Sequence, residues 1–194
     1  MKIARPKAAY RIGYIESKGP DWVMIGDVKI KSRVLRVNLD TAHRVFIFLA
    51  TCGSELEEWS HQATDYLMQF WADMIKEDVL DQALQFLINH IIEQYEPGKT
   101  SSMSPGSLHD WPLPAQKEVF TILGNYSHEI GVKLTDSFLM IPNKTVSGML
   151  FPTEESFKSC QLCPRNNCPN RGAPYDPSLF KKKYQDIKES LVSE

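Results

Sequence analysis

The longest regular pattern in the chain is helical. Between residues 66 and 95, apolar side chains recur at steps of three and four, which predicts a long helix with one wide buried face. Ser54 and Glu57 have the spacing of a capping box, so the helical region is expected to span 54–96. Glu96-Pro97-Gly98 is expected to end it, because proline cannot continue a helix.

Strand patterns precede this region, and residues 1–50 are predicted to form N-terminal strands. The run 45–50 is the most apolar in the chain and belongs to a predicted buried strand over 44–50. The remaining predicted strands are a hairpin over 23–30 that turns at Gly26-Asp27, a strand over 33–37, and a pair at 138–142 and 146–151 joined through 143–145.

The composition favours one domain without a strong electrostatic field. The 194 residues include 22 basic and 24 acidic side chains, for a formal net charge of −2. Such a balance gives no general attraction to nucleic acid or to an anionic membrane, so neither is expected as a partner. The longest apolar run has six residues, far too few for a membrane span. We therefore expect a single domain over 1–194 with a cytoplasmic location.

Three cysteines gather in one short segment near the C-terminus. Cys160, Cys163 and Cys168 have the spacing Cys-x2-Cys-x4-Cys, and a proline follows each of the last two. Closely spaced thiolates can share one metal centre, and the prolines keep such a loop away from helical geometry. The pattern predicts a metal loop over 156–175, with an iron–sulfur cluster, most simply a four-iron, four-sulfur cluster, favoured over zinc. Ordinary thiols in a polar loop are the alternative.

Cys52 is the remaining cysteine, and it follows the buried strand directly. Three thiolates leave a tetrahedral zinc ion or a cubane cluster one ligand short, so Cys52 is a candidate fourth ligand. A buried structural cysteine would show the same pattern. His109 or an open coordination position are the other possibilities.

A long polar segment rich in proline, glycine and serine covers 99–114, and loops of this length in small domains usually have a function. Pro114 is expected to begin a short helix that ends at Gly124. A C-terminal helix is predicted over 177–193, capped by Asp176 and with Pro177 in its first turn.

Four motifs in this part of the chain carry a family resemblance. Ser104-Pro105-Gly106, Asp110-Trp111-Pro112 and the run from Gly131 to Pro142, together with Val146-Ser147-Gly148, resemble the reactivation domain of cobalamin-dependent methionine synthase. The sequence is more similar still to small stand-alone homologues of that domain. The close match covers about residues 100–151, which we take as an activation-domain-like core.

The resemblance implies an α+β fold with a curved antiparallel sheet and packed helices. In the family, the Pro-Gly loop and the strand after it form a cleft for S-adenosylmethionine, and the domain docks on a bound corrinoid. Carried over to this chain, the implied cofactor-binding residues are Ser104, Pro105, Gly106, Asp110, Trp111, Ser147 and Gly148. Trp111 would offer an aromatic platform or a docking contact, although a loop tryptophan also commonly seals the edge of a core.

The chain also departs from the family pattern. Ser102 stands where the family has an arginine that pairs with the ligand carboxylate, and Ser107 stands where it has a tyrosine. Without that charge-assisted contact, S-adenosylmethionine is expected to bind weakly or not at all. The sequence shows no corrinoid-binding or methyltransferase segment, so if the protein acts on a corrinoid, the partner is expected to be a separate protein.

Two function classes follow. In the first, an iron–sulfur accessory protein docks on a corrinoid protein and supports reductive activation of its cobalt by electron transfer. In the second, the chain is a non-redox activation module, stapled by zinc or binding S-adenosylmethionine. The sequence contains no Gly-x-Gly-x-x-Gly motif for a flavin or nicotinamide and no hydrolase nucleophile motif, so these enzyme classes find no support.

Overall fold

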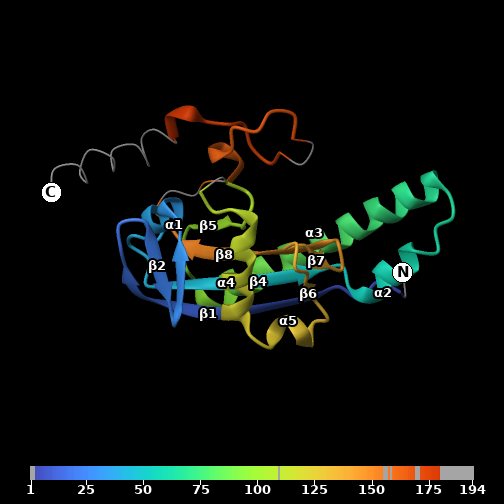
Figure 1. Cartoon of the computed structure of the whole chain (residues 1–194), viewed down its shortest axis with the longest axis horizontal. Helices are drawn as coiled ribbons and strands as arrows, with labels where there is room; N and C mark the ends of the chain where they lie inside the picture. Colours follow the sequence, from blue (N-terminus) through green and yellow to red (C-terminus); the bar gives the residue numbers. More distant parts are fainter. Residues whose placement is uncertain (1–2, 109, 155–156, 158, 169–170, 180–194) are drawn as a thin grey trace.

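The computed structural model describes residues 3–108, 110–154, 157, 159–168 and 171–179. Its main feature is a six-stranded antiparallel sheet in the order β3-β2-β1-β4-β8-β5, shown in Figure 1. The strands of this sheet are β1 (Lys7–Lys18), β2 (Trp22–Ile25), β3 (Val28–Lys31), β4 (Arg44–Thr51), β5 (Thr100–Met103) and β8 (Thr145–Pro152). A two-stranded sheet pairs β6 (Lys133–Leu134) with β7 (Met140–Ile141). The helices are α1 (Arg33–Asn38), α2 (Ser54–Ser60), α3 (Tyr66–Tyr95), α4 (Gln116–Leu123) and α5 (Tyr126–Glu129), with short 3₁₀ turns η1 (Leu113–Ala115) and η2 (Ser159–Leu162). The predicted α+β class with an antiparallel sheet is confirmed.

β4 lies at the centre of the sheet because its apolar residues can be buried on both faces. One face packs against α1, α4 and the segment around Trp111, which share the larger core cluster. The other face presents Phe46 and Phe48 to the C-terminal half of α3, where Leu87 and Ile91 are buried. The two faces thus have separate helical covers, with α4 and α3 on opposite sides of the sheet.

The hairpin predicted at Gly26-Asp27 is confirmed by the pairing of β2 with β3. The strand predicted over 33–37 is wrong, because these residues form α1. Ser32 starts that helix: its hydroxyl accepts a hydrogen bond from the Leu35 N–H at 3.1 Å. Asp110, from a distant part of the chain, adds a second acceptor for the same helix end. The helix is therefore stabilised by a contact that no local pattern reveals.

The hairpin predicted between 138–142 and 146–151 is also wrong. β7 pairs with β6, whereas β8 lies between β4 and β5. The segment predicted as a long loop contributes the edge strand β5, in which alternate residues Ser101 and Met103 are buried. Long-range pairing with β8 makes this polar segment a strand, although its own β-propensity is low.

The helical region is confirmed over most of 54–96, but it consists of α2 and α3 separated by a turn. The predicted capping box is wrong: Gly53 occupies the N-cap position, without a side-chain cap, and Ser54 is already helical. α3 ends where the Glu-Pro-Gly pattern predicted, and Glu96 at its C-cap takes the left-handed conformation. The prediction of a wide buried face is confirmed only for the C-terminal half of α3, because the apolar side chains at the start of the helix are exposed.

At the C-terminus, Asp176 accepts hydrogen bonds from the N–H groups of Ser178 and Leu179, at 2.9 and 3.1 Å, and so caps the helical turn that begins at Pro177. The rest of the helix predicted to reach residue 193 lies outside the described residues, as does His109. In the part of the chain that is described, no helix combines the length and the apolar character that crossing a membrane requires.

Candidate functional site

The Pro-Gly loop over 104–111 is held closed by its own backbone. Gly106 has φ +82°, a backbone conformation that residues with a side chain rarely adopt. Its N–H donates a hydrogen bond to the Trp111 carbonyl at 2.8 Å. The Ser107 N–H and hydroxyl both donate to the Ser104 carbonyl, at 3.2 and 2.5 Å. The glycine is required here by the turn itself, so its presence in the motif has a structural cause besides any ligand.

Trp111 does not form an exposed platform. Its side chain is 0% exposed and packs in the core beneath the loop, so the alternative that it seals the core edge is the one the structure shows. Its indole Nε1 is buried without a hydrogen-bond partner among the described residues. A surface contact through the Trp111 ring is therefore excluded in this conformation.

The Asp110 carboxylate is hydrogen-bonded to other groups of the protein. Its Oδ2 accepts hydrogen bonds from the Ser32 hydroxyl at 2.6 Å and from the Val34 N–H at 2.9 Å. Carboxylates at this position stabilise a helix because they satisfy an unpaired N–H group and complement the helix dipole. Asp110 thus attaches the Pro-Gly loop to the start of α1.

Ser147 and Gly148 lie on β8 and hold neighbouring elements against it. The Ser147 hydroxyl donates to Gln116 Oε1 at 2.5 Å, and both residues are buried. A Cβ on Gly148 would lie 2.5 Å from the Met103 carbonyl oxygen and 2.9 Å from Ser104 Oγ. Gly148 therefore permits β5 and the start of the Pro-Gly loop to approach β8 closely.

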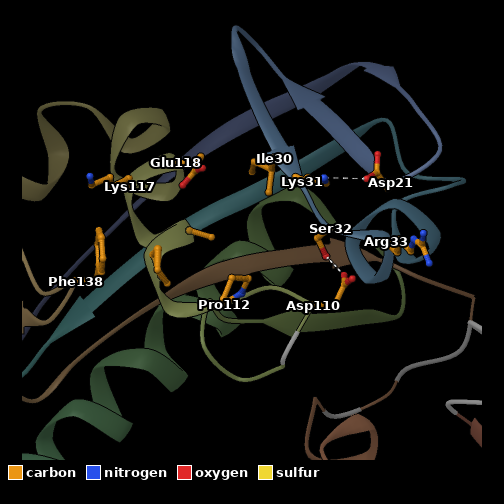
Figure 2. A pocket seen from close by; sticks show the side chains of 12 residues that line it. Asp21, Ile30, Lys31, Ser32, Arg33, Asp110, Pro112, Lys117, Glu118 and Phe138 are labelled. Atoms are coloured by element: carbon orange, nitrogen blue, oxygen red, sulfur yellow. Dashed lines mark hydrogen bonds and ion pairs between the residues drawn. The ribbon is translucent and has the colours of Figure 1, made fainter.

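A pocket of about 690 Å³ opens beside the loop, between the β3–α1 connection and α4 (Figure 2). Its charged lining comprises Asp21, Lys31, Arg33, Asp110, Lys117 and Glu118. Asp21 pairs with Lys31 at 3.5 Å, and the Lys117 ammonium lies 5.1 Å from the centre of the Phe138 ring. Glu118 Oε2 is buried without a hydrogen-bond partner in the described part of the chain.

Sequence reasoning missed the N-terminal contribution to this pocket. Asp21, Lys31 and Arg33 come from the β2–β3 hairpin and its exit, far from the Pro-Gly motif in sequence. Nothing in their local sequence distinguishes them from ordinary surface charges. Only the antiparallel order of the strands brings the hairpin beside α4.

The cysteine segment is attached to the same side of the sheet as the Pro-Gly loop. Leu162 is buried in the larger core cluster, and the Phe157 N–H donates to Ser101 Oγ at 2.8 Å. Arg171 closes the segment, because its guanidinium donates to the carbonyls of Cys160 at 3.0 Å and Cys163 at 3.4 Å. These contacts organise a segment that contains few apolar residues.

Cys160, Cys163 and Cys168 are all partly exposed and unpaired by disulfides. The Gly172 N–H lies 3.3 Å from Cys160 Sγ, the kind of backbone contact that stabilises a thiolate ligand. Among the described residues, however, no group of three or more histidine, cysteine or acidic side chains is arranged to hold a metal ion. The structure thus brings the three cysteines into one loop without converging their side chains.

The structure does not bring Cys52 to that loop. Thr51 pairs with Thr145 at one end of β8, whereas the cysteine segment leaves the other end, beyond Pro152. Eight strand residues span roughly 25 Å. Cys52 is fully buried, and burial, with a further contribution from Glu57, raises its pKa to about 11. This is the environment of a structural cysteine.

Comparison with known proteins is consistent with the motifs. Residues 105–162 match the family model for the vitamin B12 dependent methionine synthase activation domain. The fold is similar to the crystal structure of the MetH reactivation domain bound to AdoHcy, with a TM-score of 0.65 and 14% identity. The similarity covers 98% of this chain and 70% of that one. No curated protein matches the chain. The chain thus has the fold of the reactivation domain, and its segment 105–162 carries the sequence signature of the activation-domain family.

Proposed function

We propose that the protein is an activation module that docks on a separate corrinoid protein and supports reductive activation of its cobalt. The observation that carries the proposal is the match of residues 105–162 to the activation-domain family, within a fold similar to the MetH reactivation domain. The matched segment contains the Pro-Gly loop, one wall of the 690 Å³ pocket and the start of the cysteine segment.

The docking contact proposed here is the exposed apolar rim next to the loop. Because Trp111 is buried, the contact passes to Pro112 and Leu113, with Leu113 37% exposed in η1. Leu139, 59% exposed, follows the pocket-lining Phe138 in sequence. So few exposed apolar side chains suit a transient complex with a small interface.

Mixing the protein with a cobalt(II) corrinoid protein under reducing conditions tests the proposal. Binding is measured separately by calorimetry, so that a docking failure and a redox failure are distinguished. We expect a change in the cobalt absorption spectrum that Leu113→Glu slows at least tenfold and that Tyr14→Glu, at an exposed position on β1, leaves unchanged. If no candidate corrinoid protein binds or changes spectrum, the proposal is wrong.

The cysteine loop is proposed to hold an iron–sulfur cluster through Cys160, Cys163 and Cys168. Support comes from their spacing and partial exposure and from the N–H contact to Cys160 Sγ. Cys52 is left out of this ligand set because of its position and burial, so the fourth ligand comes from elsewhere. A cluster at this loop would supply single electrons.

Anaerobic preparation followed by iron, sulfide and zinc analysis tests the metal. We expect iron and sulfide that Cys163→Ser removes and Cys52→Ala retains, because only the first residue lies in the loop. Zinc in place of iron would favour the alternative, a zinc-stapled module without a redox role. Metal lost equally in both variants would restore Cys52 as a ligand.

S-adenosylmethionine is proposed to bind weakly, although the similar MetH domain was crystallised with AdoHcy. Ser102 replaces the arginine of the family pattern, and a lost charge-assisted hydrogen bond costs on the order of 1.5–3 kcal/mol. Calorimetry that finds tight binding would contradict this expectation and favour the ligand-binding activation module.

A further inference from the structure

The first third of α3 exposes an unusual number of large apolar side chains. Five of them form what we call the α3 stripe, with exposed fractions of 91% for Tyr66, 65% for Leu67, 56% for Phe70, 55% for Trp71 and 50% for Met74. Contiguous apolar surface of this kind on a globular protein marks an interaction site. The remaining question is which partner covers it.

The stripe lies on the side of α3 that faces away from the protein. Leu67, Phe70, Trp71 and Met74 follow one another at steps of three, one and three, so they share a helix face. The buried residues of the same helix segment, Ala72 and Lys76, lie on the opposite side. In Figure 1, this part of α3 extends beyond the edge of the large sheet. Its outer face is therefore open along more than two turns.

An apolar groove runs beside the stripe. It has a volume of about 400 Å³ and is lined by Trp59, Gln62, Ala63, Met68, Trp71, Ala72 and Ile75, from α2, α3 and the turn between them. Trp71 belongs to both features, so the groove and the stripe form one continuous surface. A large side chain from another helix fits a groove of this kind as a knob fits a hole.

We propose that the α3 stripe is the interface of a symmetric dimer, in which α3 of a second copy packs antiparallel on α3 of the first. In such a contact each copy offers its stripe to the groove of the other, as the two-fold symmetry of most homodimers requires. The surface has both parts, a ridge and a groove, on one element.

Charge permits this self-contact. Residues 66–72 contain no charged side chain, so two copies bring no like charges together at the centre. Of the acidic side chains that follow, Asp73 and Glu77 are both paired with Lys144, at 2.8 and 3.0 Å, so their charge is partly offset. The lack of basic residues in the stripe also argues against an anionic membrane as the occupant.

The area is sufficient. Side chains of this size, each half exposed or more, offer roughly 600 Å² per copy. Two copies would bury about 1,200 Å², which is the lower end of the range for stable specific interfaces. The contact also leaves the Pro-Gly loop free, because α3 and α4 cover opposite faces of the sheet.

Sedimentation velocity over a wide concentration range tests the dimer, with reductant present so that Cys160, Cys163 and Cys168 form no disulfides between chains. We expect the wild type to sediment with twice the mass of one chain at high concentration. Phe70→Glu is expected to weaken the dimer at least tenfold, because it places a charge in an apolar contact. Phe86→Glu is the matched control: Phe86 is also on α3 and 74% exposed, but it lies about four turns further along.

A photocrosslinking benzophenone amino acid in place of Tyr66 gives a second readout that does not depend on a destabilising charge. It should yield a covalent dimer of the otherwise intact chain. A wild type that remains monomeric at all concentrations, or a dimer that survives Phe70→Glu, overturns the proposal. Flotation with anionic vesicles that is lost in Phe70→Glu would replace it with a membrane-binding surface.

Discussion

At the residue scale, the same side chain takes on different chemistry at two places in the fold. Cys160, Cys163 and Cys168 lie partly exposed in a loop, whereas Cys52 is fully buried after the central strand. Burial disfavours the thiolate, and Glu57 adds a nearby carboxylate, so the pKa of Cys52 rises from 9.0 to about 11. The folded protein therefore holds this proton more tightly than the unfolded chain does.

This difference predicts a pH dependence of stability. The contribution of Cys52 is fully present below about pH 9, the unfolded value, and is lost as the pH rises through about 11. Two pKa units correspond to about 3 kcal/mol at most. Urea unfolding at about pH 8 and about pH 11 should show a smaller loss of stability for Cys52→Ala than for the wild type.

Tyr10 titrates in an overlapping range, because its hydrogen bond with Tyr95 and its burial raise its pKa to about 12. It contributes equally to both proteins, so the difference between them isolates Cys52. Identical pH profiles would show that the thiol is not held in its neutral form by the fold.

At the scale of secondary structure, α1 depends on a residue outside itself. Asp110 accepts hydrogen bonds from Ser32 Oγ and the Val34 N–H, at 2.6 and 2.9 Å, and so joins the Pro-Gly loop to the helix start. Asp110→Ala should lower the free energy of unfolding by about 1–2 kcal/mol. Asp110→Asn should lose less, because its amide oxygen still accepts a hydrogen bond. Denaturant titration measures both, with exposed Asp136→Ala as the control.

If Asp110→Ala were as stable as the wild type, the contact would contribute nothing to α1. The carboxylate would then be available for a ligand in the adjacent pocket, as the family resemblance first implied. The same variant therefore decides between a structural and a ligand-binding role for this aspartate.

At the scale of the whole molecule, Lys76 connects α3 to two other parts of the chain. Its buried ammonium lies 3.1 Å from Glu57 Oε2 in α2 and 3.2 Å from Asn143 Oδ1 before β8. Lys76→Met should cost about 3 kcal/mol, because it leaves a largely buried carboxylate without its counter-ion. Adding Glu57→Leu should recover part of this loss, since the unpaired charge is then removed as well.

Lys144→Met serves as the comparison, because its ion pairs with Asp73 and Glu77 are more exposed and should be worth about 1 kcal/mol or less. Thermal unfolding of these three variants and of the wild type measures the series. Equal losses at Lys76 and Lys144 would show that burial of the Lys76 network adds no stability.

The candidate site was only partly predictable. The Pro-Gly loop and the loop that holds three cysteines follow from sequence motifs and spacing, and the closeness of the Pro-Gly loop to β8 was implied by the family resemblance. The burial of Trp111, the separation of Cys52 from the other cysteines and the charges of the β2–β3 hairpin in the pocket do not. Each depends on which strands pair, and a motif does not specify the neighbours of its side chains.

The sequence by itself determined the elements whose hydrogen bonds and apolar periodicity are local. These include the β2–β3 hairpin, the buried β4 and the end of α4 at Gly124. Tertiary structure decided the rest: α1 forms where Asp110 meets Ser32 across 78 residues, and β8 pairs with β4 and β5 instead of β7. It also decided that the apolar side chains at the start of α3 remain exposed, because the sheet ends before the helix does. A periodic pattern specifies a face, whereas the extent of the neighbouring element determines whether that face is buried.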